Sequence, residues 1–288
     1  MTASAALIEH AHIRILDLRK AALWQQFERW TRPRRAKVER VVVGFFRKQE
    51  NEIITNINAG KGVIPIRRDG KVIISPESKG PSEWLDWGKW LITFEEFGQL
   101  FLPEVVGDKG TLEMGKLLIG VDFDVKNPSV LAFINRRSFR SSRDTNVGTQ
   151  EALQALFQKS LLAGEGIPEM TKRINKLFDF KKRYQGEQIA RSEVIRASNF
   201  GAEHAYLQSG VVSEKEWIVS RDERLCPFCE PLAGRRVPVG FVFFQRGDVT
   251  QGISDAGNVV TLPLDYEDIF HAPLHVQCRC TIVPVLAA

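Results

Sequence analysis

The chain has 288 residues, of which 43% are hydrophobic and 26% are charged, and these values are ordinary for a water-soluble globular protein. The length allows two domains, or one domain with a long appendage. No stretch approaches the roughly 18 apolar residues that a membrane span needs, and the first residues lack the basic and apolar regions of a secretory signal. We therefore expect no membrane span and a protein that is made and kept in the cytosol.

Positive charge is concentrated near the N-terminus. Residues 1–80 hold sixteen Lys and Arg against eight Asp and Glu, so they carry +8 while the other 208 residues carry −3. A basic arm of this kind suits a polyanion or an acidic protein surface. The alternative is a solvated amphipathic helix, and composition alone does not decide between the two.

Region 1–80 is predicted to be a basic helical arm with a hairpin and a linker. Apolar residues recur at steps of three or four on both sides of Pro33, which predicts two helices, the second ending near Gly60. Neither helix can bury its apolar stripe alone, so we expect the arm to pack on a partner or on the body. The pair Asp69-Gly70 between two apolar runs predicts a hairpin, and residues 76–81 are interpreted as the linker.

Region 81–145 is predicted to be helical and rich in aromatic residues. Tryptophan and phenylalanine residues recur at helical spacing from Trp84 to Phe101, which favours a packed core over an aromatic ligand cage. Later in this region four arginines surround one phenylalanine, and we expect them to lie on an exposed loop. They are candidates for contact with nucleic-acid phosphates, although solvation alone explains them equally well. These arginines are Arg136, Arg137, Arg140 and Arg143.

Region 146–210 is predicted to form helices. The first begins with Thr149 as N-cap and stops at Gly164, and the second starts near Pro168. The third covers about 185–209, and its stripe of small residues, which includes Gly201, indicates close packing against another helix. Polar residues of the same helix, among them Asn199, either line a binding face or attach the helix to the strands that follow, and we favour attachment.

Region 211–288 is predicted to be a small strand- and loop-rich Cys/His module. Short extended pieces such as 216–220 alternate with turns, including one at residues 221–223, and residues 245–262 are interpreted as a loop because they are rich in Gly, Asp and Asn. The predicted fold class is therefore α+β, with mainly helical N-terminal and central regions before this module. The predicted domain division is 1–80, 81–145, 146–210 and 211–288.

All four cysteines lie in the last 63 residues, as Cys226, Cys229, Cys278 and Cys280. In a reducing compartment, clustered cysteines are more often metal ligands than disulfides. A Cys-x-x-Cys turn places two thiolates at the separation that tetrahedral zinc requires. The remaining ligands must then come from His271, His275, Cys278 and Cys280.

The favoured ligand set is Cys226, Cys229, His275 and Cys278, with Cys280 as the nearest substitute. Four protein ligands close a zinc site and make it structural. Such a site suits a region with little continuous apolar stripe, because bound metal supplies folding free energy that a small core lacks. Disulfides and plain buried thiols remain alternatives.

Three motifs together resemble the C-terminal region of phage minor head proteins, the Mu F-like head-morphogenesis family. They are IARSEV at 189–194, DERLCPFC at 222–229 and PLHVQCRC at 273–280, with Trp217 on a predicted strand between the first two. Two departures are visible: Ser192 stands where threonine is usual, and Val276 replaces the usual proline after His275. Neither departure removes a candidate ligand. The resemblance covers about residues 146–284.

The resemblance implies a role in building or using a phage head. Members of this family lie in few copies inside the capsid, associate with the portal vertex and influence DNA packaging or ejection. The implied partners are the portal protein, other capsid or scaffold proteins and the packaged double-stranded DNA. The implied location is the virion interior, after assembly in the host cytoplasm, and the shared region implies no enzymatic activity.

Two other functions each fit part of the sequence. A zinc-supported nuclease would use Asp222, His271 and His275 as its site, but only eight residues follow Cys280, which leaves no room for the helix that usually presents a second catalytic histidine. A DNA-binding module is favoured by the basic arm and the arginines of 136–143. It overlaps with the head-protein interpretation, because packaged DNA is the neighbour of any protein inside a capsid.

Overall fold

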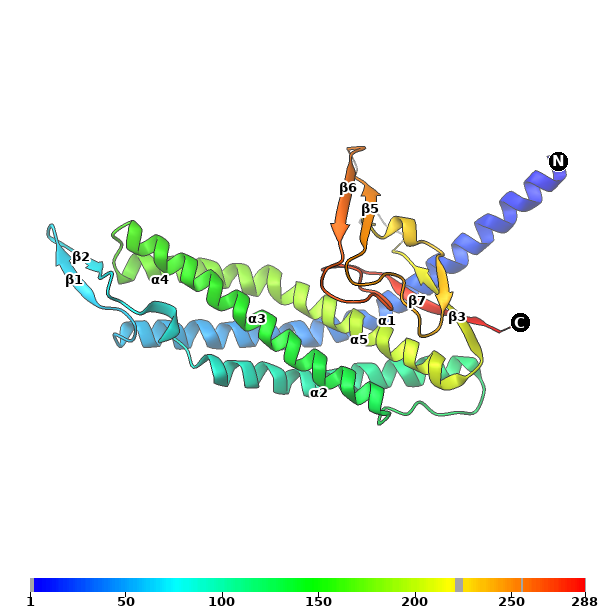
Figure 1. The fold of residues 1–288 in the computed structure, drawn as a ribbon, viewed down its shortest axis with the longest axis horizontal. Coiled ribbons are helices and arrows are strands. Elements are labelled where there is room, and N and C mark those ends of the chain that lie inside the picture. Colours follow the sequence, from blue (N-terminus) through cyan, green and yellow to red (C-terminus); the bar gives the residue numbers. More distant parts are fainter. Residues whose placement is uncertain (1–2, 221–224, 255, 288) are drawn as a thin grey trace. The chain divides into compact units, whose positions relative to one another are not determined.

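The computed structural model describes residues 3–220, 225–254 and 256–287, with side chains described from residue 17 onward. The fold is α+β, as predicted, with long helices followed by a C-terminal region of short strands (Figure 1). The helices are α1 (Ala3–Asn58), α2 (Trp87–Leu117), α3 (Pro128–Leu162), α4 (Ile167–Phe180) and α5 (Gly186–Ser209). A π-helical turn η2 (Lys181–Gln185) joins α4 to α5. No helix in the described part of the chain combines the length and the apolar character that crossing a bilayer demands.

The chain divides into two compact units, each assembled from segments that are distant in sequence. Unit 1 consists of Met1–Arg35, Glu104–Lys126 and Arg191–Ala288, and unit 2 of Ala36–Pro103 and Asn127–Ala190. Helices α1, α2 and α5 each contribute residues to both units. This grouping follows contacts in space, whereas the division into 1–80, 81–145, 146–210 and 211–288 follows chain order and stays a prediction.

Unit 2 is helical, and its core contains the predicted aromatic residues. The Phe45 ring makes edge-to-face contacts with Trp90 and Phe94, with centroids 5.0 and 4.8 Å apart. Trp84, which is fully buried, meets Phe157 in the same way at 5.5 Å. These contacts confirm that the aromatic stripe of region 81–145 serves packing, because offset aromatic pairs of this kind stabilise a core beyond their buried area.

The predicted hairpin in region 1–80 is present in unit 2. Strands β1 (Pro65–Arg68) and β2 (Lys71–Ile74) pair antiparallel, with Arg68 opposite Lys71. Asp69 and Gly70 between them have φ angles of 50° and 75°. Left-handed backbone at both central residues defines the tight hairpin turn that Asp-Gly favours. A short 3-10 turn, η1 (Gly80–Ser82), ends the segment interpreted as a linker.

Two predicted helix boundaries are wrong, because the helices continue through them. Pro33 lies inside α1 and does not divide it. Thr149 lies inside α3, where its hydroxyl donates to the Thr145 carbonyl at 2.8 Å, so it is not an N-cap. The N-cap of α3 is Asn127, whose side chain accepts a hydrogen bond from the Ser129 N–H at 3.0 Å. The arginine cluster predicted on a loop therefore lies on α3.

The N-terminal arm was expected to pack on a partner or on the body, and many of its described apolar side chains are buried within the chain. Phe27 of α1 belongs to the core of unit 1. Val42, Phe46 and Ile53, further along α1, are fully buried in unit 2. This helix therefore packs within the chain itself and helps to form the core of each unit.

Unit 1 contains a three-stranded antiparallel sheet in the order β4-β3-β7. Strand β3 (Val212–Ile218) is central, between β4 (Arg236–Pro238) and β7 (Thr281–Leu286). A short 3-10 turn, η3 (Glu230–Leu232), precedes β4. The fully buried Trp217 of β3 pairs in register with Ile282 of β7, and both belong to the core of the unit.

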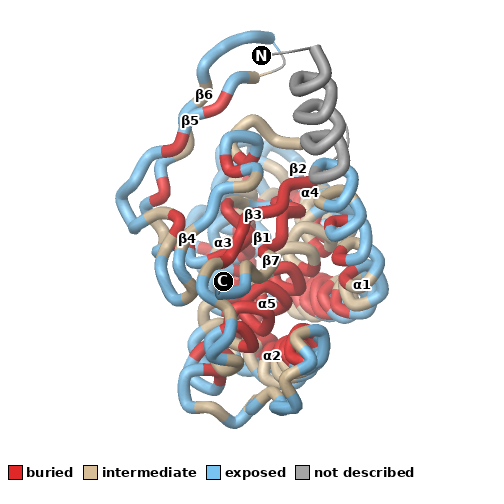
Figure 2. Tube along the Cα trace, turned by 90° about the vertical axis from the view of Figure 1, so that its right-hand side faces the viewer, coloured by how far each residue is buried: buried red, intermediate tan, exposed pale blue. Residues whose placement is uncertain are grey.

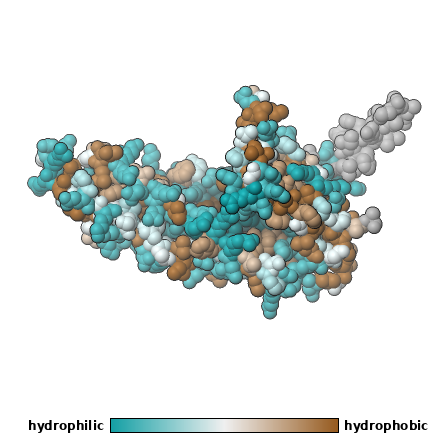
Figure 3. All heavy atoms as spheres, viewed as in Figure 1, coloured by the Kyte–Doolittle hydropathy of each residue, from teal (hydrophilic) through white to brown (hydrophobic). Residues whose placement is uncertain are grey.

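The segment 245–262 was predicted to be a loop, and this prediction is wrong. It forms most of a second hairpin, β5 (Val249–Ile253) paired with β6 (Val259–Pro263). Val249, Ile253 and Val259 are 57%, 66% and 68% exposed, and Figure 3 shows hydrophobic side chains gathered on this hairpin. Its other face includes the buried Thr250 and Gly252.

Helix α5 carries the close contact that its small residues predicted. A Cβ added to Gly201 would lie 2.5 Å from the backbone oxygen of Val106 in α2, so only glycine fits there. Ala197, Ala202 and Ala205 of the same helix are fully buried. In Figure 2 most of α5 is coloured as buried, and its residues Ile195, Ala202 and Tyr206 belong to the core of unit 1.

Candidate metal centre

The first half of the cluster is the Cys-Pro-Phe-Cys turn that precedes η3. The backbone N–H of Cys229 donates to the Cys226 carbonyl at 3.1 Å and also lies 3.3 Å from the Cys226 sulfur. The Cys226 sulfur thus accepts a backbone hydrogen bond, and both sulfurs are brought to one side of a tight turn. This is the local geometry that the Cys-x-x-Cys spacing predicts for a metal-binding knuckle.

The second half is the turn that leads into β7. The Cys278 N–H donates to the His275 carbonyl at 3.1 Å, and Gln277 between them has a left-handed φ of 67°. This turn brings His275 and Cys278 to the first pair of cysteines. Cys280 follows immediately before β7 begins.

The five predicted ligands come together in space. The His275 Nε2 lies 2.8 Å from the Cys226 sulfur and 3.3 Å from the Cys229 sulfur. The Cys229 and Cys278 sulfurs are 3.7 Å apart, close to the ~3.8 Å that follows from tetrahedral zinc–sulfur bonds of about 2.3 Å. Cys229 also forms a group with Cys278 and Cys280, and the ligand atoms of each group lie within 4.8 Å of one another. The cluster could therefore hold a metal ion.

The ring of His275 is oriented for coordination. Its Nδ1 lies 2.7 Å from the carbonyl oxygen of Val276. A proton on Nδ1 donates to that oxygen, which leaves the Nε2 lone pair directed at the two sulfurs. Histidine ligands of metal sites are typically held by such a hydrogen bond at the second ring nitrogen.

The electrostatics of the cluster favour thiolates beside a cationic or metal-bound imidazole. A hydrogen bond from the Cys229 thiol, reinforced by His275, lowers the pKa of Cys226 to about 5. Burial opposes charge on His275, but the adjoining sulfurs of Cys226 and Cys278 raise its pKa to about 9. The pKa of Cys229 is raised, first by its hydrogen bond to Cys226. A divalent cation compensates this crowding of negative charge, because it stabilises thiolates directly.

Disulfide bonds and buried thiols without metal are the two alternatives to a metal site, and each requires a different arrangement of the sulfur atoms. The four cysteines are free thiols. The Cys229–Cys278 sulfur separation of 3.7 Å is far beyond the ~2.05 Å of a disulfide bond. Buried thiols without metal would leave His275 facing sulfurs at hydrogen-bond distance with no further role.

Of the residues considered for a nuclease site, the two described ones, His271 and His275, share no group of candidate metal ligands. His271 belongs to neither ligand group, and its Nδ1 lies 2.8 Å from the Ala272 carbonyl oxygen. Burial lowers the pKa of His271 to about 3, so its ring is neutral. Asp222, together with the predicted turn at 221–223, lies outside the described residues.

The polar residues of α5 attach the helix to the second half of the cluster, as predicted. The Asn199 amide nitrogen donates to the Cys280 carbonyl at 3.3 Å, and its oxygen accepts from the Thr281 hydroxyl at 2.9 Å. The Arg191 guanidinium donates to the Gln277 side chain at 3.1 Å. These bonds hold residues on both sides of Cys278, the side chain of Gln277 and the backbone of Cys280.

One supporting residue was missed by sequence reasoning. The indole N–H of Trp24, on α1, donates to the backbone carbonyl of Arg279 at 2.9 Å. Arg279 separates Cys278 from Cys280, so this bond fixes the backbone between two candidate ligands. No local signal in the sequence joins positions 255 residues apart.

The candidate nucleic-acid contacts lie in unit 2. Arg136, Arg140 and Arg143 follow one another at steps of four and three along α3, which places them on one face of the helix over about 10 Å. Arg136 and Arg143 are exposed, whereas Arg137 and Arg140 are half-buried. Arg143 also pairs with Asp144 at 2.8 Å, both side chains being about half exposed.

Comparison with known proteins gives one match. Residues 151–283 match the family model described as phage Mu protein F like protein. No curated protein matches the chain, and no solved structure matches it. The matched range contains all five residues of the cluster and the whole of α5.

Proposed function

Because residues 151–283 match the model of the phage Mu protein F like family, we propose that the chain is a member of that family, a minor head protein that acts inside the capsid, in contact with the portal. The membership favours a structural role in head morphogenesis, and no enzymatic step is needed to explain it. The family match carries this proposal. Packaging and ejection of DNA are the stages at which a protein in this position acts.

Zinc is the metal that the cluster suits best. Its donors are sulfur and imidazole nitrogen, the set that structural zinc sites use, and four protein ligands close the coordination sphere. The proposed ligands are Cys226, Cys229, His275 and Cys278, with Cys280 beside them as the substitute. Bound zinc would join the turn before η3 to the turn before β7 and so stabilise the C-terminal region.

Contact with packaged DNA is proposed for the arginine face of α3. Three of the four guanidinium groups, those of Arg136, Arg140 and Arg143, lie on one face within about two helical turns and suit a row of phosphates. Backbone contacts of this kind ignore base sequence. Log affinity should fall with log salt by about 0.9 per phosphate contact on duplex DNA. Changing Arg136, Arg137, Arg140 and Arg143 to alanine should flatten this slope, and an unchanged slope would exclude the face as the phosphate contact.

The decisive experiment for the head role is co-purification with the portal protein encoded by the same genome. A tagged portal protein should retain this chain at physiological salt, and purified particles should contain it at low copy number. A wash in several hundred millimolar salt separates portal affinity from simple adhesion to DNA, and nuclease treatment gives the same control. Loss of the chain from both the portal and the particles would overturn the proposal.

A metal-dependent cleavage assay distinguishes the remaining alternative. If the chain were a zinc-supported nuclease, duplex DNA would be cut in the presence of a divalent cation, and His271→Ala would abolish the cleavage. A head protein that only contacts DNA leaves the duplex intact under the same conditions.

A further inference from the structure

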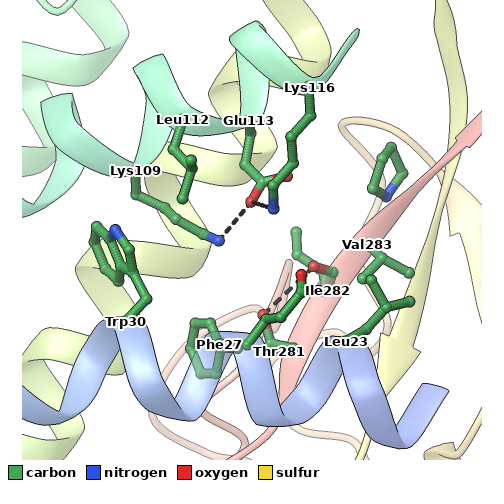
Figure 4. Close-up of a pocket in the computed structure, with 12 residues that line it drawn as sticks. Leu23, Phe27, Trp30, Lys109, Leu112, Glu113, Lys116, Thr281, Ile282 and Val283 are labelled. Atoms are coloured by element: carbon green, nitrogen blue, oxygen red, sulfur yellow. Dashed lines mark hydrogen bonds and ion pairs between the residues drawn. The ribbon is translucent and has the colours of Figure 1, made fainter. Parts of the chain in front are cut away.

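Unit 1 contains a cavity that is separate from the cysteine cluster. Its volume is about 410 Å³, and its walls come from α1, α2 and β7 (Figure 4). This volume lies within the range of about 300–1,000 Å³ that small-molecule sites occupy. Much of the wall is apolar, including Leu23, Phe27, Trp30, Leu112 and Ile282.

The polar part of the wall has more positive than negative charge. Lys109, which is 4% exposed, pairs with Glu113 of the same helix at 2.5 Å. The same carboxylate also pairs with Lys116 at 2.8 Å and accepts a hydrogen bond from the Tyr206 hydroxyl at 3.3 Å. One carboxylate therefore serves two ammonium groups at the cavity wall, and one positive charge is left in excess.

Among the described residues Lys109 pairs with Glu113 alone, and the carboxylate of the adjacent Asp108 pairs with Arg34 at 2.7 Å. Burial lowers the pKa of Lys109, Glu113 opposes that effect, and the other charged groups that act on it, Lys116 and Arg34, are cations. The rings of Phe27 and Trp30 lie 5.5 and 5.4 Å from its ammonium nitrogen, which compensates part of the charge. A buried cation that shares its only carboxylate is costly unless an anion joins it.

Figure 4 shows how the two kinds of wall face each other. The Lys109 and Glu113 side chains extend from α2 toward the cavity, opposite Phe27 of α1 and beside Ile282 of β7. A ligand that fills this space meets ammonium groups at one end and aliphatic or aromatic carbon along the rest.

We infer that this cavity is a binding site for an amphipathic anion, an apolar body that ends in a carboxylate. The carboxylate pairs with Lys109 and Lys116, while the apolar body lies against Leu23, Phe27 and Ile282. Both a free organic acid and the carboxyl end of a peptide have this chemistry. The inference depends on neither the cysteine cluster nor the head role.

The test uses 4-phenylbutyrate as the probe, titrated calorimetrically into the full-length protein. A ligand with about a dozen non-hydrogen atoms is expected to bind at roughly 0.1–1 mM. The neutral twin 4-phenylbutanol has the same body without the charge, and it should bind about tenfold more weakly because the charge-assisted hydrogen bonds are lost. An acetylated tetrapeptide ending in phenylalanine, compared with its amidated form, distinguishes a peptide terminus from a free acid.

Variants localise the binding. Lys109→Met keeps the stem and removes the charge, so it should weaken phenylbutyrate about tenfold and leave phenylbutanol unchanged. Leu112→Phe fills the cavity from a position that is 38% exposed, and it should weaken both probes. Lys126→Met, an exposed change away from the cavity wall, is the matched control.

Three results would overturn the inference. They are no saturable binding of either acid, equal binding of acid and alcohol, and full affinity in the Leu112→Phe variant. Because the probe comparison uses the unchanged protein, it decides the matter even if Lys109→Met fails to fold.

Discussion

The side-chain oxygen of Asn199 accepts a hydrogen bond from the backbone N–H of Ile282 at 3.1 Å, which fastens the middle of α5 to the edge strand β7. Strand β7 pairs with β3 on its other side. Two residues further along β7, Pro284 has no N–H to offer. At these two positions the edge of the sheet offers no free backbone donor, which discourages pairing with a foreign strand.

Replacing Asn199 with alanine should therefore destabilise unit 1. The change removes the partners of the Ile282 N–H, the Thr281 hydroxyl and the Cys280 carbonyl, all in a fully buried site. We expect the free energy of unfolding in urea to fall by about 3 kcal/mol. Asn175→Ala, at an exposed position on α4, is the control and should change it by less than about 0.5 kcal/mol. Equal effects of the two variants would contradict the role given to Asn199.

The zinc content of cysteine variants distinguishes the proposed zinc ligands from Cys280, the substitute ligand. Protein purified under reducing conditions should contain about one zinc per chain, because the four ligands form one closed site. Cys229→Ser should abolish zinc binding, since Cys229 is common to both ligand groups. Cys280→Ser should keep the zinc if Cys280 is only the neighbour of the site.

Chelation adds an independent measurement. Removal of zinc should lower the melting temperature of the wild type and leave that of Cys229→Ser unchanged. Elemental analysis that finds no zinc in fresh, reduced protein would reject the site outright.

Two glycine-to-alanine substitutions should change the stability of the protein in opposite directions, because only Gly201 lies in the close contact between α5 and α2. Gly201→Ala should destabilise the protein by about 2 kcal/mol, because the added methyl group meets the backbone of Val106 rather than a flexible side chain. Gly148→Ala in α3 meets nothing within 4 Å, and it should stabilise by about 0.5–1 kcal/mol through helix propensity. Thermal unfolding of both variants tests the pair, and stabilisation by Gly201→Ala would show that the helices are not in close contact.

Histidine burial predicts a loss of stability in mild acid. Burial lowers the pKa of His271 from 6.5 to about 3 and that of His204 to about 4. Between these values and 6.5 the unfolded chain binds protons that the folded chain does not, so stability is full above about pH 6.5 and falls as pH decreases toward 3.

The variant His271→Leu isolates this effect. Its free energy of unfolding should depend less steeply on pH between about 6 and 4 than that of the wild type, with both proteins compared at equal zinc content. Identical slopes would mean that His271 is protonated in the folded protein.

The helical core of unit 2 was predictable where apolar residues keep a helical period, as from Trp84 to Phe101. The extension of α3 on the N-terminal side of Thr149 was not predictable from the sequence, because many of the buried residues of α3 are polar. The hydroxyls of Ser138 and Thr149 donate to carbonyls four residues back, and the buried Asn146 amide accepts from Gln49 at 3.1 Å. The sequence alone does not distinguish a polar residue that is hydrogen-bonded inside the protein from one that is exposed to solvent.

The candidate site was predicted from spacing, since a Cys-x-x-Cys turn and a second Cys/His turn are local features. What supports it was not predictable, because Trp24 reaches Arg279 only through the tertiary fold. The β5–β6 hairpin was missed for a related reason. Its Gly252 packs so near the Pro227 carbonyl that an added Cβ would lie 2.2 Å from it, and glycine in the sequence was interpreted as a loop residue.

The two units are completed at different stages of protein synthesis. Every residue of unit 2 has been made once synthesis reaches Ala190. The first segment of unit 1, with Phe27 of α1, must wait for Ile282 of β7, its neighbour in the same core. While the last segment is still being made, the nascent chain therefore has a finished helical unit and an N-terminal helix whose apolar side chains are still uncovered. A chaperone is needed in that interval.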